Sequence, residues 1–128
     1  LGVWVVTDDL CMGTRLFWNL VDTSLDPMTG LAQRYLCHPP CARMRPYTLR
    51  LDHIKDMVRE FKVHGVIYET IKFCDIFGAE KPMIKEDLLA SNIPVLELDI
   101  QYGGGAAVGQ IRTRVEAFIE MLEKEQKR

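Results

Sequence analysis

Short apolar runs alternate along this chain with longer stretches in which apolar residues recur every three or four positions. The runs are rich in β-branched residues, which is typical of strands buried on both faces. They predict three strands, at Val3–Val6, Gly65–Ile71 and Ile93–Asp99. The longer stretches predict helices over about Gly13–Val21, over Thr48–Lys62, over a short segment that begins near Pro82, and over Gln110–Glu125.

One segment fits neither pattern. Asp22–Pro46 carries four prolines and a glycine at irregular spacing, namely Pro27, Gly30, Pro39, Pro40 and Pro46. Proline and glycine interrupt both helices and strands. We therefore expect loops and short helical turns there.

The order of strands and helices predicts the fold class. Strands that alternate with helices are usually parallel and are joined by right-handed helical crossovers, as in α/β proteins. We expect a small Rossmann-like parallel sheet flanked by helices in three layers, as a single α/β domain over residues 1–128. The chain opens on Leu1 and enters a strand-like run at once. We therefore expect a domain excised from a larger multidomain subunit.

Composition and charge exclude several classes of protein. The hydrophobic and charged fractions are those of an ordinary globular domain, and the formal net charge is −2. A nucleic-acid-binding domain usually carries a basic excess, so we expect no nucleic-acid partner. No apolar run reaches the roughly 20 residues that span a bilayer, and no signal peptide opens the chain. We expect a cytoplasmic protein that does not bind membranes.

The four cysteines, Cys11, Cys37, Cys41 and Cys74, leave several interpretations open. Two disulfides are disfavoured, because a domain of this size can build its own core and no export signal is visible. Cys37 and Cys41 flank His38, but a structural zinc site needs a second ligand pair that the sequence lacks. The simplest interpretation for each cysteine is a small buried hydrophobe, and for Cys37 this is the favoured one.

Polar residues follow each predicted strand. In an open parallel sheet, ligands bind beyond the carboxyl ends of the strands. The segments at that edge are Asp8–Cys11, Lys72–Asp75 and Asp99–Tyr102, with a glycine-rich stretch over Gly103–Gly109. The glycines could cradle a phosphate, although their spacing is not that of a dinucleotide-binding loop, and a mobile loop against a neighbouring domain is an equal alternative. A third interpretation is that loops are polar in any protein.

Cys74 has the clearest chemical potential of the four cysteines. It comes directly after a predicted buried strand, between Phe73 and Asp75 and close to Lys72. A cysteine nucleophile needs a histidine base, but His64 precedes the same strand and should lie at the opposite edge of the sheet. Ligation of an iron–sulfur cluster needs no base, only cysteines from separate segments.

Four segments, in the same order along the chain, carry a resemblance to a known family. They are Val5–Arg15, Arg34–Leu36 with Pro40–Met44, His64–Asp75 with its Lys-Phe-Cys-Asp ending, and Gly109–Phe118. Together they resemble the C-terminal domain of subunits in the 2-hydroxyacyl-CoA dehydratase and benzoyl-CoA reductase family. No single segment would suffice, but four of them in order make the resemblance specific.

The resemblance implies an oxygen-sensitive enzyme subunit with a 4Fe–4S cluster, in which Cys74 matches a cluster-ligating cysteine. The remaining ligands are implied to come from earlier domains. Cys11 and Cys41 match family-like positions without a ligand role assigned, and the catalytic residues stay unknown. The implied partners are a related second subunit, an ATP-dependent iron–sulfur activator and an acyl-CoA substrate.

Two reactions follow from the resemblance: the radical dehydration of a 2-hydroxyacyl-CoA, or the ATP-driven reduction of an aromatic acyl-CoA. An alternative within the family is a subunit for electron transfer or for reduction of another small molecule. From a different class, the domain could be a non-catalytic Rossmann-like module that binds a partner and whose cysteines are core residues. Iron and sulfide content of the full-length protein would discriminate between these.

Overall fold

The computed structural model describes residues 1–101 and 108–127. The chain divides into two compact units, one of Val5–Phe61 and one of Leu1–Trp4 with Lys62–Arg128. A single α/β domain over residues 1–128 therefore stays a prediction, and each unit is described by itself. The predicted glycine loop at Gly103–Gly105 lies outside the described residues. No helix in the described part of the chain is long and apolar enough to span a bilayer.

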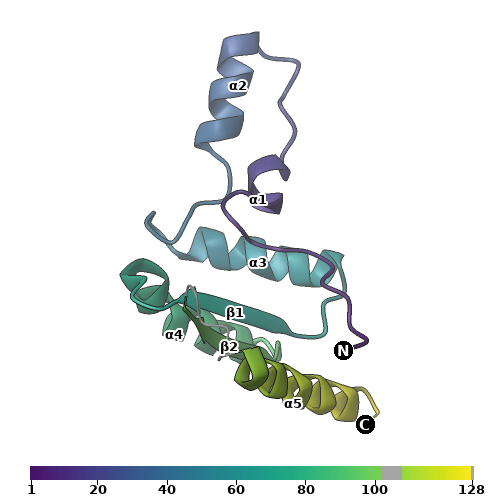
Figure 1. Ribbon diagram of the computed structural model, residues 1–128. Coiled ribbons are helices and arrows are strands. Elements are labelled where there is room, and N and C mark those ends of the chain that lie inside the picture. Colours follow the sequence, from purple (N-terminus) through teal and green to yellow (C-terminus); the bar gives the residue numbers. More distant parts are fainter. Residues whose placement is uncertain (102–107, 128) are drawn as a thin grey trace. The chain divides into compact units, whose positions relative to one another are not determined.

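The C-terminal unit is built on two parallel strands, β1 (Val66–Ile71) and β2 (Val95–Ile100) (Figure 1). They run in register, from Val66 opposite Val95 to Ile71 opposite Ile100. The connection between them contains the helix α4 (Asp75–Ala90), and a last helix, α5 (Val108–Gln126), contacts β2. The predicted α/β class, the parallel pairing and the final helix are confirmed.

The two strands present a polar face to α4. Side chains alternate along a strand and registered neighbours share a face, so Tyr68 and Thr70 lie beside Glu97 and Asp99. Two lysines of α4 pair with these acids: Lys81 Nζ lies 2.7 Å from Asp99 Oδ1, and Lys85 Nζ lies 3.3 Å from Glu97 Oε1. The ion pairs fix α4 along the strands.

Helix α5 approaches the chain closely where β1 is about to begin. A Cβ atom at Gly65 would lie 2.8 Å from Phe118 Cζ and 2.9 Å from Leu122 Cδ1. Phe118 is buried and Leu122 half-buried, as the apolar stripe of this helix predicts. Glycine at position 65 therefore allows the helix to close on the strand.

Helix α4 is longer than predicted. The sequence places its start near Pro82, whereas the helix begins at Asp75 and contains Pro82 in its interior. An interior proline removes one backbone hydrogen bond and crowds the carbonyl four residues earlier, here that of Gly78. Proline is also favoured in the first turn of a helix, so Pro82 suggested a helix start at that point. The true start, Asp75, lies further upstream. The helix ends as predicted before Asn92, which adopts φ 58°.

The N-terminal unit is helical in its described elements: α1 (Thr14–Phe17), α2 (Pro27–Leu36) and α3 (Thr48–Glu60). The prediction for α3 is confirmed, and its apolar stripe is buried at Leu51, Ile54 and Met57. Helix α1 covers only four of the predicted residues. That the helix predicted over Thr48–Lys62 covers the sheet stays a prediction.

The prediction of loops and short helical turns over Asp22–Pro46 is wrong where α2 forms, because α2 is a regular helix of 10 residues. Asp26 caps this helix, because its Oδ2 accepts a hydrogen bond from the backbone N–H of Thr29 at 3.2 Å. Pro27 occupies the first helical position, where its missing N–H costs nothing. Gly30 is buried, and a Cβ there would lie 2.8 Å from the carbonyl oxygen of Asp22. Pro27 and Gly30 favoured a loop in the sequence. In the structure Pro27 starts the helix, and Gly30 allows the helix to pack closely against the backbone of Asp22.

The predicted first strand is also wrong. Val3–Val6 adopts no strand in the structure, and the side chains of all four residues are exposed. β-Branched residues favour a strand only where a neighbouring strand takes up the backbone hydrogen bonds. Within residues 1–101 and 108–127 the only strands are β1 and β2, so the sheet has two described strands rather than three.

Candidate functional site

A hollow of about 620 Å³ opens at the carboxyl edge of the two strands. The ends of β1 and β2 and the first turns of α4 form its walls, which is where a parallel sheet is expected to bind ligands. The lining residues are Thr70, Ile71, Lys72, Phe73, Cys74, Asp75, Gly78, Ala79, Lys81, Asp99, Ile100 and Gln101. The predicted juxtaposition of Cys74, Asp75 and Asp99 is confirmed.

Cys74 lies between the end of β1 and the start of α4. Its backbone N–H donates to the carbonyl of Ile71 at 2.9 Å, and its own carbonyl accepts from the N–H of Gly78 at 2.9 Å. It is therefore the N-terminal cap residue of a 16-residue helix. The N-terminus of a helix carries a partial positive charge that favours an anionic group. The half-buried thiol is free and contributes to the lining of the hollow.

The charged side chains around the hollow lie in electrostatically favourable surroundings. Lys81 Nζ pairs with Asp99 Oδ1 at 2.7 Å, and the ammonium of Lys72 lies over the Phe73 ring, 5.5 Å from its centroid. Asp75 occupies the first turn of α4, where a carboxylate complements the helix dipole. No sequence pattern pointed to Lys81, because it lies in the part of the helix that Pro82 obscured.

Thr70 brings an unusual hydroxyl to this site. The residue is 5% exposed, and its Oγ1 has no hydrogen-bond partner within the described residues. A buried hydroxyl without a partner costs free energy, because the chain gives up a hydrogen bond to water and gains none.

We expect Thr70→Val to stabilise the full-length protein by about 1 kcal/mol, because valine keeps the shape and removes the unpartnered hydroxyl. The matched control is Thr113→Val, since Thr113 is exposed on α5 and its hydroxyl donates to the carbonyl of Gly109 at 3.1 Å. This control should give no gain. Thermal unfolding measures both, and a loss of stability in Thr70→Val would show that the hydroxyl has a partner in the complete protein.

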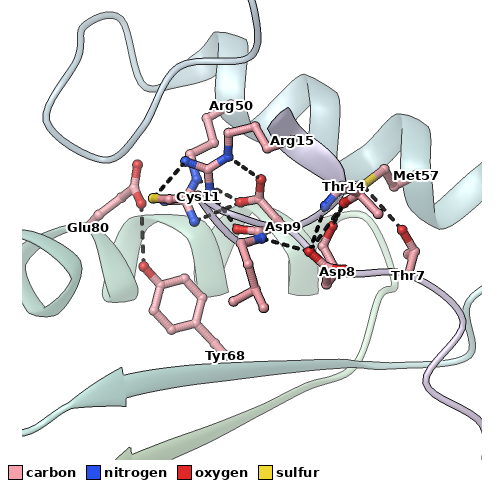
Figure 2. A network of polar contacts seen from close by, with 11 residues as sticks. Thr7, Asp8, Asp9, Cys11, Thr14, Arg15, Arg50, Met57, Tyr68 and Glu80 are labelled. Carbon is pink, nitrogen blue, oxygen red and sulfur yellow. Dashed lines mark hydrogen bonds and ion pairs between the residues drawn. The ribbon is translucent and has the colours of Figure 1, made fainter. Parts of the chain in front are cut away.

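The loop after the predicted first strand forms a charged network in the N-terminal unit (Figure 2). Asp9 lies between two buried guanidinium groups: its Oδ1 is 2.8 Å from Arg15 Nε, and its Oδ2 is 2.8 Å from Arg50 Nη2. Arg15 is only 1% exposed. The sequence placed Asp9 at a sheet edge, but this network is a structural tie between the loop, α1 and α3. No spacing signal pointed to Arg50.

The neighbouring Asp8 shapes the same loop. Its Oδ1 accepts hydrogen bonds from the backbone N–H groups of Leu10 and Thr14, both at 3.0 Å. A Cβ at Gly13 would overlap with that oxygen, so only glycine allows the carboxylate to fold back over the start of α1. Asp8 therefore acts as a cap for this short helix rather than as a group facing a ligand.

The other cysteines belong to the N-terminal unit, and all of them are free thiols. Cys11 is exposed, with its Sγ 3.7 Å from Arg15 Nη1. The prediction that Cys37 is buried is wrong, because α2 forms and leaves Cys37 exposed at its C-terminal end. Cys41 is half-buried. Within residues 1–101 and 108–127, no three histidine, cysteine or acidic side chains gather as a metal site would require.

His53 is a buried histidine on α3. Its Nε2 has no hydrogen-bond partner in the part of the chain that the structure describes, and its ring meets the Trp18 ring edge-on at 5.3 Å. Burial lowers the pKa of His53 below its ordinary value of 6.5. Asp9 and Asp56 oppose this shift in pKa, while Arg15 and Arg50 add to it.

A histidine whose pKa is lower in the folded state binds a proton more tightly when unfolded. The contribution of His53 to the free energy of unfolding should therefore be at its maximum above about pH 6.5. It should fall as the pH drops below that value, by up to about 1.4 kcal/mol per pH unit. The thermal unfolding midpoint of the full-length protein at about pH 7.5 and about pH 5.5 tests this, with His53→Gln as the control. An equally steep loss in His53→Gln would show that another group is responsible.

Comparison with known proteins shows which family the chain resembles. The family model "2-hydroxyglutaryl-CoA dehydratase, D-component" matches residues 1–122. The chain is 34% identical over 122 residues to the "Putative dehydratase subunit YjiM" of Escherichia coli (strain K12), covering 94% of this chain and 31% of that relative. It is 30% identical over 123 residues to the "(R)-phenyllactyl-CoA dehydratase beta subunit" of Clostridium sporogenes, covering 94% and 32%.

A third relative is named for a different type of reaction. The chain is 25% identical over 126 residues to one of the benzoyl-CoA reductase subunits of Thauera aromatica, covering 95% of this chain and 32% of the relative. The chain thus spans about a third of the length of each curated relative it matches.

Proposed function

Because the chain belongs to the family of the 2-hydroxyglutaryl-CoA dehydratase D-component, we propose that it forms part of an iron–sulfur enzyme subunit that processes acyl-CoA thioesters. The observation that carries the proposal is the hollow at the carboxyl edge of β1 and β2, whose lining includes the free thiol of Cys74 at the start of α4. The resemblance to the family implies a cluster ligand at Cys74, and the hollow beside this thiol has room for a ligand.

The residues present fit one corner of a 4Fe–4S cluster. Cys74 offers a thiolate in a half-buried position, and the N-terminus of α4 favours negative charge there. One thiolate cannot hold a cluster, and the described residues contain no other ligand set. The remaining ligands would come from the part of the subunit that the relatives possess and this chain does not span. One-electron transfer at low potential is the chemistry that such a cluster supplies when bound.

Two reactions compete within the proposal. The named relatives include a dehydratase of an acyl-CoA and a reductase of an aromatic acyl-CoA. We propose radical dehydration of a 2-hydroxyacyl-CoA or reduction of an aromatic acyl-CoA. A related second subunit and an ATP-dependent iron–sulfur activator would be the partners, and the location would be cytoplasmic. A third layer and further strands would be completed by the rest of the subunit.

The chain's own residues have definite tasks in such a site. Cys74 holds a ligand position, while the Lys81–Asp99 pair keeps the start of α4 against the end of β2. Ile71, Phe73 and Ile100 contribute apolar side chains to the lining of the hollow. With the rest of the subunit in place, this wall would help to exclude water, which protects reactive intermediates.

The experiment that tests the proposal is iron and acid-labile sulfide analysis of the full-length protein, purified without oxygen. We expect about four iron atoms and about four sulfides per subunit. A partner-binding module whose cysteines are core residues would contain neither. Iron in the absence of acyl-CoA binding would instead favour an electron-transfer subunit.

A further inference from the structure

Among the described residues of the N-terminal unit, three arginines are buried, and one of them lacks an acidic partner. Arg15 and Arg50 are 1% and 4% exposed, and both pair with the carboxylate of Asp9. Arg34, on α2, is 9% exposed, yet it forms no ion pair within residues 1–101 and 108–127. A charged side chain is rarely buried unless an opposite charge compensates it. The charge of Arg34 is therefore uncompensated in the described part of the chain.

The guanidinium of Arg34 is nevertheless held in a fixed position. Its Nε donates to the carbonyl of Asn19 at 2.7 Å, and its Nη2 donates to the carbonyl of Leu16. The remaining nitrogen, Nη1, is buried and has no hydrogen-bond partner among the residues that the structure describes. The Cζ atom lies 4.8 Å from the centroid of the Tyr35 ring, but a ring has no net charge with which to neutralise a cation. These contacts orient the guanidinium without compensating its charge.

A groove of about 180 Å³ lies beside Arg34, between α2 and the loop that follows α1. Arg34, Asn19 and Gln33 line it, and their side chains carry N–H donors. Of the lining residues only Asp22 is acidic, and its Oδ1 already accepts hydrogen bonds from the backbone N–H of Ser24 at 2.9 Å and from the Ser24 hydroxyl at 2.6 Å. The groove therefore offers a cation and hydrogen-bond donors to one small anionic group.

We propose that this groove binds a carboxylate, and that Arg34 is the residue that recognises it. A guanidinium matches a carboxylate in both charge and shape. Two sources can supply the carboxylate: an acidic side chain from the part of the subunit that this chain does not span, or a free carboxylate ion. The chain spans about a third of the length of each relative, which leaves room for such a side chain. The inference does not depend on the proposed iron–sulfur chemistry.

The first arm of the test adds sodium acetate to the full-length protein, with sodium chloride at the same ionic strength as the reference. If the groove takes a free carboxylate, saturating acetate should raise the unfolding temperature by at least about 2 °C, because a ligand stabilises the folded state. Arg34→Gln should abolish the rise. Arg43→Gln is the matched control and should keep it, because Arg43 is exposed in the same unit and does not line the groove.

The second arm detects a carboxylate that belongs to the subunit. A carboxylate paired with Arg34 has a lower pKa in the folded state, so the stability it provides is present at about pH 7 and is lost as the pH falls through about 4. The destabilisation caused by Arg34→Gln should therefore shrink by at least about a third between about pH 7 and about pH 3.5. The same comparison in an Asp22→Asn background removes the acid of the lining.

Three results would overturn the inference. An acetate effect that persists in Arg34→Gln would show that acetate binds elsewhere. A pH dependence that vanishes in the Asp22→Asn background would show that Asp22 compensates Arg34. If acetate has no effect on the wild type and Arg34→Gln is equally destabilised at both pH values, Arg34 serves only to hold the carbonyls of Leu16 and Asn19.

Discussion

Asp9→Ala is expected to destabilise the full-length protein by about 3–5 kcal/mol. The carboxylate of Asp9 contacts two guanidinium groups at 2.8 Å, those of Arg15 and Arg50, and Arg15 is almost fully buried. Its removal leaves the buried charge of Arg15 without the carboxylate it pairs with. Burial of an uncompensated charge is among the most costly effects of a point mutation. Urea unfolding, combined with hydrogen exchange in α1 and α3, measures the loss.

The matched control uses an ion pair on the surface of the same unit. Asp56 pairs with Arg59, and both side chains are exposed. Exposed pairs contribute between about 0 and 1 kcal/mol, so Asp56→Ala should change stability by no more than about 1 kcal/mol. If Asp9→Ala costs no more than Asp56→Ala, the network in Figure 2 does not hold the N-terminal unit together.

Cys74→Ser is expected to have the largest effect on function. In the complete subunit, purified without oxygen, it should lower iron content and reduce acyl-CoA turnover by at least about 100-fold. The fold should remain intact, because Cys74 is half-buried between a strand and a helix, outside the buried core. Iron analysis, turnover and thermal unfolding on the same sample measure all three.

Cys37→Ser is the control for this variant. Cys37 is exposed at the C-terminal end of α2, and its replacement should leave iron, turnover and stability unchanged. If Cys74→Ser keeps wild-type iron and activity, the ligand assignment is wrong and Cys11 or Cys41 becomes the next candidate. If Cys37→Ser loses iron, Cys37 has a role that the sequence did not indicate.

The local pattern of apolar residues was sufficient to predict those helices and strands whose contacts lie within one unit. The stripes of α3 and α5 and the β-branched runs of β1 and β2 predicted four elements correctly, because the two helices bury part of their stripes and the two strands pair with each other. The carboxyl edge of the strands placed Cys74, Asp75 and Asp99 at one hollow for the same reason. Parallel strands with a helical crossover leave few other places for these residues.

Prediction failed where the outcome depends on a neighbour. Val3–Val6 has the composition of a strand, but a strand needs a paired edge that composition does not reveal. Pro27 and Pro82 have opposite meanings, one at the first position of α2 and one inside α4, and the residue type alone does not distinguish them. The Asp9 network joins residues 41 positions apart, which no local pattern contains.

The most direct test of the central claim is the electron paramagnetic resonance spectrum of the full-length protein, reduced at low potential without oxygen and recorded with and without an acyl-CoA. We expect the signal of an iron–sulfur cluster, and we expect the thioester to shift it, because the hollow at Cys74 would hold cluster and acyl group side by side. In Cys74→Ser the signal should be lost or altered. A protein without a cluster signal, or a signal that saturating acyl-CoA leaves unchanged, would contradict the assignment of this hollow to acyl-CoA chemistry.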